Sequence, residues 1–258
     1  MKIFNSYVKP EAKITLDTHP SRIVTLGYDA YDTLRALGVE NLVIAAPKHR
    51  IPEYISSMPD SVVDTKSLTN IDLEQIRLLK PDLIIASART SFLLDDLEKI
   101  APVFNYDTYS DYWSNFDDIN LELARIVNKE AEAKHLLLDL NSRADRIRVA
   151  SKQSPSKTLL LLHNENSFTT FKPNSRFALF FTLLDFTPVE RDFSFTELAE
   201  SIKVSEIATL DADRVFIINR SAAMRYDPEQ DAHEQQMLMQ RDDLQTIRAF
   251  DTGNLFFL

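Results

Sequence analysis

Short apolar runs alternate with amphipathic stretches through the first hundred or so residues. The apolar runs have the length of strands, and the stretches between them place apolar residues three or four apart, as one face of a helix does. This alternation is typical of a parallel sheet covered by helices on both faces. The runs expected as strands are 22–27, 41–46, 82–87 and 102–106, and those expected as helices are 29–37, 71–80 and 91–100.

A long helical stretch follows. Neither Gly nor Pro occurs between Pro102 and Pro155, and apolar residues recur at helical spacing from 117 to 150, a pattern that allows a break near Asn128. Strand patterns return at 157–164, 167–172 and 214–219, with a helix expected at 176–184. We therefore predict an α/β fold of two parallel-sheet lobes bridged by a long rigid helix: an N-terminal lobe at 1–114, the helix at 115–150, and a C-terminal lobe at 151–258.

One segment is nearly repeated. "LKPDLIIASART" at 79–90 resembles "LDADRVFIINRS" at 210–221, and one offset (220 − 89 = 131) keeps helix, turn and strand in register. Shared ancestry and the general likeness of any two αβ units both explain the match. In either case Arg89 and Arg220 lie just beyond the carboxyl end of a strand, where open parallel sheets bind ligands. The alternative is that they pair with nearby carboxylates such as Asp95 or Asp227, or simply reach solvent.

A third arginine and a tyrosine extend this candidate site. Arg176 follows a predicted turn and cap, so it lies in the first turn of a helix, where a cation is best explained by an anionic partner. Arginine suits planar, delocalised anionic oxygens because its donors form a fixed fork. Tyr28 follows the first strand, and it either stacks on an aromatic ligand or caps the sheet as a half-buried side chain.

Composition and charge argue against several classes of function. The chain has 29 basic and 39 acidic residues, a net charge of −10, which disfavours binding to nucleic acid or to an anionic membrane surface. It has no cysteine, and its three glycines form no phosphate-binding loop. The five histidines show no metal-binding spacing, and no nucleophile accompanies His163. We expect no enzyme, no intrinsic cofactor and no metal site.

The residues now described resemble a known family. The run from Arg22 to Val39, the run from Ile71 to Val103 and the Lys-Glu-Ala that opens the long helix are similar to the substrate-binding proteins of bacterial ABC importers for ferric siderophores. Within that family, "SART", "PNSRF" and "INRS" resemble the arginine-bearing turns of the catecholate-type branch, matching Arg89, Arg176 and Arg220. The resemblance implies a class III periplasmic binding protein-like fold that holds its ligand between two lobes.

The resemblance also implies a mechanism of charge neutralisation. A ferric siderophore with three catecholates is already coordinately saturated, so three guanidinium groups would suffice to bind it. Relatives that complete the iron with His and Tyr differ from this chain, which has Ala199 and Phe256 near those positions. Glu74 matches a glutamate that grips the ABC permease in the family, and Glu206 lies beside its counterpart under the 131-residue offset. The expected partners are a ferric siderophore and a membrane-embedded permease, and we expect a monomer.

Family members carry a signal segment and a closing C-terminal helix, and this chain is expected to lack both. The resemblance implies a periplasmic or lipid-anchored protein. One alternative keeps the fold but binds haem, cobalamin or another metal chelate. An alternative of another class is a cytosolic α/β enzyme or sensor.

Overall fold

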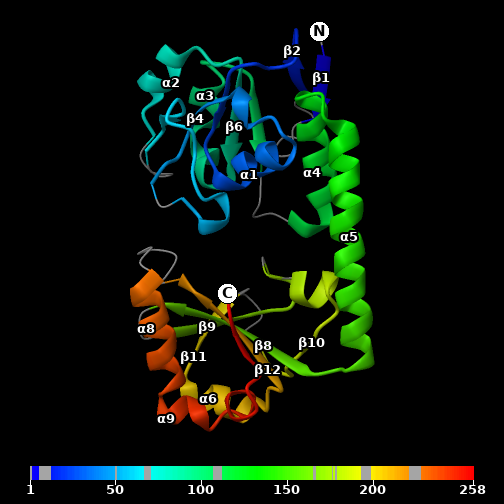
Figure 1. Cartoon of the computed structure of the whole chain (residues 1–258), viewed down its shortest axis with the longest axis vertical. Helices are drawn as coiled ribbons and strands as arrows, with labels where there is room; N and C mark the ends of the chain where they lie inside the picture. The colour runs from blue at the N-terminus through cyan, green and yellow to red at the C-terminus, as the bar shows by residue number, and fades with distance from the viewer. Residues whose placement is uncertain are drawn as a thin grey trace. The chain divides into compact units, whose positions relative to one another are not determined.

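The computed structural model describes residues 2–5, 13–49, 51–66, 71–106, 112–164, 167–175, 177, 179–192, 199–220 and 228–258. These residues fall into two compact units, Met1–Leu140 and Asn141–Leu258, whose boundary lies inside one helix. Each unit has its own sheet (Figure 1). The two-lobed α/β class predicted from the pattern of the sequence is confirmed.

The first unit is built on a five-stranded parallel sheet with the order β5-β4-β3-β6-β7. Its core strands begin and end close to the predicted apolar runs, because those runs are buried on both faces. The bounds are Ile23–Thr25 for β3, Val43–Ala46 for β4, Val63–Asp64 for β5, Leu83–Ser87 for β6 and Val103–Tyr106 for β7. A separate antiparallel pair consists of β1 (Lys2–Asn5) and β2 (Lys13–Leu16).

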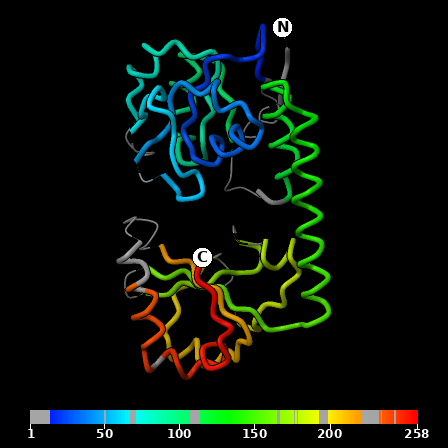
Figure 2. The backbone as a smooth tube through the Cα atoms, in the orientation of Figure 1, coloured from blue at the N-terminus to red at the C-terminus, as the bar shows by residue number. Residues whose placement is uncertain are grey.

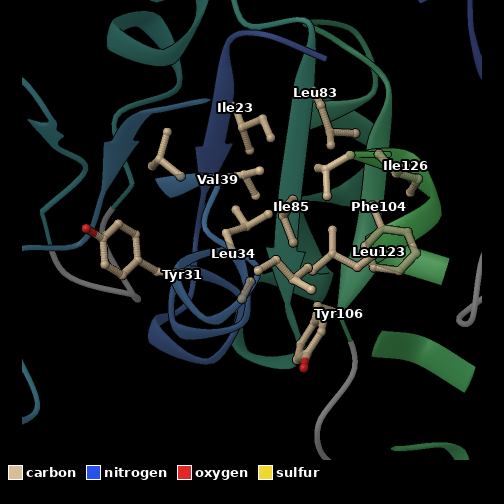
Figure 3. Close-up of a cluster of buried hydrophobic side chains, with 14 of the residues drawn as sticks. Ile23, Tyr31, Leu34, Val39, Leu83, Ile85, Phe104, Tyr106, Leu123 and Ile126 are labelled. Atoms are coloured by element: carbon tan, nitrogen blue, oxygen red, sulfur yellow. The ribbon is translucent and has the colours of Figure 1, made fainter. Parts of the chain in front are cut away.

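Helices cover both faces of this sheet. On one face α1 (Tyr28–Ala36) and α4 (Tyr112–Ile126) pack on the strands, and Figure 3 shows Leu34, Phe104, Leu123 and Ile126 in this cluster. On the other face α2 (Leu73–Leu79) and α3 (Leu94–Leu97) place Ile76 and Leu97 against the strands. Single-turn segments η1 (Glu40–Leu42) and η2 (Glu53–Ile55) lie in the connections around β4.

The long helical stretch is two helices, α4 and α5 (Glu130–Gln153). Asn128 has a left-handed backbone with φ of 59°, and the amides of Asn128 and Lys129 donate to the carbonyls of Arg125 and Ala124 at 3.2 and 2.7 Å. This is a Schellman turn with Asn at the left-handed position. His19 Nδ1 lies 2.7 Å from the carbonyl oxygen of Ile126, which ties the chain before β3 to the end of α4. The break allowed near Asn128 is therefore present.

The second unit is built on a mixed sheet with the order β11-β9-β8-β12-β13, and β10 pairs with β8 off this path. Its strands are β8 (Lys157–Asn164), β9 (Ser167–Phe171), β10 (Thr187–Pro188), β11 (Ala199–Ile202), β12 (Arg214–Asn219) and β13 (Leu255–Phe257). Figure 2 shows the red C-terminal strand running beside β12.

The parallel sheet predicted for this unit is found for most of its strands, and β9 is the exception. β8, β10, β12 and β13 are parallel, but β9 is antiparallel to β8 and to β11. Only residues 165 and 166 separate β8 from β9, and a connection that short joins only antiparallel neighbours. The apolar pattern identifies both strands but does not carry their direction.

Helices also pack on the second sheet. One face is covered by α6 (Val204–Ile207), α8 (Pro228–Met239), α9 (Asp242–Gln245) and α10 (Arg248–Asp251), with η5 (Ala208–Leu210) after α6. On the other face the predicted helix at 176–184 is found as a single π-helical turn, η4 (Leu179–Leu183). Its Phe180 ring lies 5.0 Å from that of Phe216, while Phe256 stays 42% exposed. This segment therefore packs on part of that face of the sheet.

Candidate ligand-binding edges

The repeat seen in the sequence extends to backbone conformation. Lys80 and Asp211 occupy equivalent positions and both are left-handed, with φ of 47° and 45°. Two residues later, Asp82 accepts hydrogen bonds from the amides of Ser21 and Arg22 at 2.8 and 2.9 Å. Asp213 likewise accepts from the amide of Lys157 at 2.9 Å. In each unit, therefore, the aspartate fastens the repeated strand, β6 or β12, to the start of its central neighbour.

Each repeated strand ends in an exposed arginine. Arg89 lies two residues beyond β6, and Arg220 directly follows β12. Within the part of the chain that the structure describes, neither guanidinium makes a hydrogen bond or an ion pair, so the alternative pairing of Arg89 with Asp95 is not found. Asp227, the alternative partner of Arg220, lies outside the described residues. Each carboxyl edge thus presents a cation to solvent.

Arg89 is carried on a short 3₁₀ helix, η3 (Ala88–Leu93), where a longer α-helix was expected from 91 onward. Thr90 is fully buried, and its Oγ1 accepts from the amide of Ser87 at 2.9 Å and donates to the carbonyl of Ser87 at 3.0 Å. These bonds anchor the helix to the last residue of β6. Arg89 therefore projects from a backbone that is fixed to the sheet.

A glycine brings the ends of two strands of the first sheet together. A Cβ on Gly27 would lie 3.1 Å from Ser87 Cβ and 2.3 Å from Oδ1 of Asp29. That oxygen accepts a hydrogen bond from the amide of Ala30 at 2.9 Å, in the first turn of α1. Glycine is therefore the residue that lets the connection after β3 approach the base of η3.

Tyr28 is held at the same edge. Its ring is partly buried against the core, and its hydroxyl donates a hydrogen bond to the backbone carbonyl of His49, in the connection after β4. Burial, followed by the negative charge of Asp64, raises the pKa of Tyr28 to about 12. The side chain thus packs as a neutral phenol that links two connections. Its contact with a ligand stays a prediction.

Because the pKa of Tyr28 is raised, we expect its hydroxyl to titrate, and its contribution to stability to be lost, only at strongly alkaline pH. In the folded chain the hydroxyl stays protonated above pH 10, so its contribution to stability is complete below pH 10 and is lost as the pH rises through about 12. We expect the phenolate absorbance of the native protein minus that of Tyr28→Phe to titrate near pH 12. A difference curve with its midpoint near pH 10 would contradict the partly buried, hydrogen-bonded hydroxyl.

The other predicted site residues lie elsewhere or outside the description. Arg176 falls outside the described residues, although Ser175 before it is buried. Glu74 is exposed on α2, where its carboxylate pairs with Arg77. Glu206 is exposed on α6 and accepts a hydrogen bond from the amide of Lys203 at 2.9 Å, so it caps its own helix. Their docking role stays a prediction.

Sequence reasoning missed Phe92, which is 69% exposed on η3, one turn beyond Arg89. The expected α-helical spacing had placed it in an amphipathic helix. The signal in the sequence is the three-residue separation from Arg89, which is informative only once the segment is known to be 3₁₀.

The described ranges contain neither a metal-binding cluster nor a membrane-spanning helix. Among those residues, no group of three or more His, Asp or Glu side chains is arranged to hold a metal ion. No helix in the described ranges has both the length and the apolar character needed to cross a bilayer.

Two α/β units of this kind define a solute-binding architecture, and the chain belongs to the periplasmic binding protein family, whose model matches residues 23–258. Among its relatives is the petrobactin-binding protein YclQ of Bacillus subtilis, 25% identical over 243 residues, which are 93% of this chain and 75% of the relative. The ferric-anguibactin-binding protein FatB of Vibrio anguillarum is 24% identical over 94% of this chain and 76% of its own. The crystal structure of the iron-uptake ABC transporter substrate-binding protein PiuA from Streptococcus pneumoniae matches with a TM-score of 0.88 and 26% identity, covering 99% of this chain and 88% of that one.

Proposed function

We propose that this protein binds an iron(III)-siderophore complex, of the catecholate or mixed catecholate type, and delivers it to an ABC permease. The observation that carries the proposal is the duplicated edge, in which the same aspartate-fastened strand ends twice in an exposed arginine without a partner among the described residues. The petrobactin- and anguibactin-binding relatives and the iron-uptake protein support the choice of ligand class.

The chemistry required is recognition of charge. Iron(III) held by three catecholates is an anion whose charge is spread over planar oxygens, and guanidinium groups match that geometry. Arg89 and Arg220 supply two such groups, and we propose Arg176 as the third. Since the siderophore saturates the iron, the protein acts as a receptor that performs no reaction and needs neither a cofactor nor an iron ligand of its own.

The proposed partners follow from the same role. Glu74 and Glu206 are exposed on helices at equivalent places in the two units, and we propose that they contact basic residues of the permease. The protein would act as a monomer in the periplasm or anchored at the cell surface. Its net charge of −10 opposes binding to nucleic acid.

Ligand titration tests the proposal. The ferric complexes of a catecholate and of a hydroxamate, together with haem and cobalamin, are titrated in parallel while the fluorescence of the single tryptophan and the eight tyrosines is followed. We expect saturable binding of the ferric catecholate that weakens as salt is added, because salt screens exposed charges. If haem or cobalamin binds more tightly than the ferric catecholate, the ligand of this protein is that chelate and not a siderophore. Failure of a folded sample to bind any of the four would overturn the proposal.

A further inference from the structure

The exposure of side chains along η3 follows a three-residue period. Thr90 is buried, and Leu93, three residues later, packs against the hydrophobic core on the sheet face that α2 and α3 cover. Arg89 is exposed, and Phe92, three residues later, is 69% exposed. In a 3₁₀ helix the side chains at i and i+3 lie over one another. Arg89 and Phe92 therefore share one exposed face of η3, which is distinct from the face that anchors it.

An exposed apolar side chain is not in itself a sign of function, since single ones are common on protein surfaces. Leu78 in the same unit is 79% exposed, but it lies near the end of α2, before the amino end of β6. Phe92 differs because it stands at the carboxyl edge in register with a guanidinium that has no partner among the described residues. Its ring and that cation are presented together.

We propose that Phe92 and Arg89 act as one recognition element for an aromatic anion, with the Phe92 ring stacking on the aryl ring whose ionised oxygens Arg89 binds. The inference rests on the proposed function and makes it more specific. A ring beside a fixed fork of donors suits an aryl group with oxygens directly attached, because both contacts fall on one planar unit. Phe92 is thus the residue that selects catecholate-type ligands over aliphatic ones.

The anchoring of η3 strengthens this assignment. Because Thr90 bonds to both the amide and the carbonyl of Ser87, the exposed face of η3 is held in place before any ligand arrives. A preorganised aromatic side chain loses little conformational freedom on binding, which raises its contribution to affinity.

The test compares two anionic iron complexes that differ in aromatic character: iron(III) with 2,3-dihydroxybenzoate and iron(III) with citrate. Phe92→Ala should weaken binding of the dihydroxybenzoate complex about 3- to 10-fold, the range expected for loss of one aromatic contact. It should leave citrate binding within about twofold. Phe92→Tyr keeps the ring and should bind both complexes as the native chain does. Leu78→Ala is the matched control, with a comparably exposed side chain at the other end of the strand.

The binding of the native chain and of the variants together distinguishes a failure of this inference from a failure of the proposed function. If the native chain binds the dihydroxybenzoate complex and Arg89→Ala weakens it while Phe92→Ala does not, the proposed function stands and the role of Phe92 is wrong. If Phe92→Ala weakens binding of both complexes equally, the proposed aromatic contact is also wrong. In that case Phe92 affects binding indirectly, through the position of Arg89 or through the local fold. If the native chain binds neither complex, both proposals fail together.

Discussion

Replacing Arg89 and Arg220 together by alanine should lower the affinity for a ferric tris-catecholate by at least about 100-fold. Hydrogen bonds to charged groups contribute about 1.5 to 3 kcal/mol each, so losing one such contact from each arginine removes about 3 to 6 kcal/mol. Both arginines are exposed, and solvent screening keeps the expected loss near the lower figure. Each single variant should lose about 10-fold.

The arginine prediction is measured by titrating the ferric catecholate at low and at high salt. The native chain should lose affinity with salt and the double variant much less, since it has fewer ligand-facing charges to screen. Arg89→Lys with Arg220→Lys keeps the charge but loses the fork, and should fall between the two. Cobalamin binding, if present, should not depend on these arginines.

A control variant with the same net charge separates the effect of these two arginines from the effect of net charge alone. Arg143→Ala with Arg146→Ala removes two exposed arginines from α5 and makes the same change of net charge, from −10 to −12 (−10 − 2). This variant should bind as the native chain does. If both double variants lose affinity equally, the loss is caused by the change in the net charge of the protein and not by the position of Arg89 and Arg220. If the Arg89 and Arg220 variant binds normally, these arginines are not ligand groups.

Replacing Leu123 by alanine should destabilise the first unit by about 3 kcal/mol. Leu123 on α4 has no exposed surface, and Figure 3 places it beside Phe104 in the cluster that fixes α4 to the sheet. The loss combines the transfer of a leucine side chain with the cavity left among neighbours that collapse only partly. Arg89 follows β6 of the same sheet, so a loosened core would also weaken ligand binding.

Urea denaturation followed by circular dichroism measures the Leu123 effect. Because the chain has two units that can unfold separately, hydrogen exchange then assigns the loss to amides of the first unit. Leu138→Ala on α5, where the side chain is 70% exposed, is the control and should change stability by less than about 0.5 kcal/mol. A loss below about 1 kcal/mol for Leu123→Ala would contradict its place in a tightly packed core.

Four strands of the first unit could be predicted closely from the sequence, whereas β1, β2 and β5 were not predicted. β3, β4, β6 and β7 all fall inside the apolar runs that pattern alone identified, and β8 has the predicted bounds of 157–164. Burial on both faces imposes a continuous apolar run, so the local sequence records it directly. The direction of β9, by contrast, depends on a two-residue connection and on its partner strand, which an apolar pattern does not encode.

The type and length of two helical segments could not be predicted from the sequence, for a similar reason. The segment after β6 has an amphipathic pattern, but it forms a 3₁₀ helix because Thr90 bonds back to Ser87. The segment at 176–184 forms only a π-helical turn, and its aromatic residues pack on Phe216. In both places tertiary contacts outweigh intrinsic helix propensity.

The sequence by itself determined the two α/β units, their core strands and the repetition that ends each copy in an arginine. Periodicity and offset carry that information because they depend only on residues near one another in the chain. The tertiary structure alone decided that Tyr28 bonds to the carbonyl of His49, that Gly27 closes on Ser87 and that Phe92 faces outward beside Arg89. Those features depend on distances between separate connections, or on how one turn is anchored to the sheet, and no local pattern specifies either.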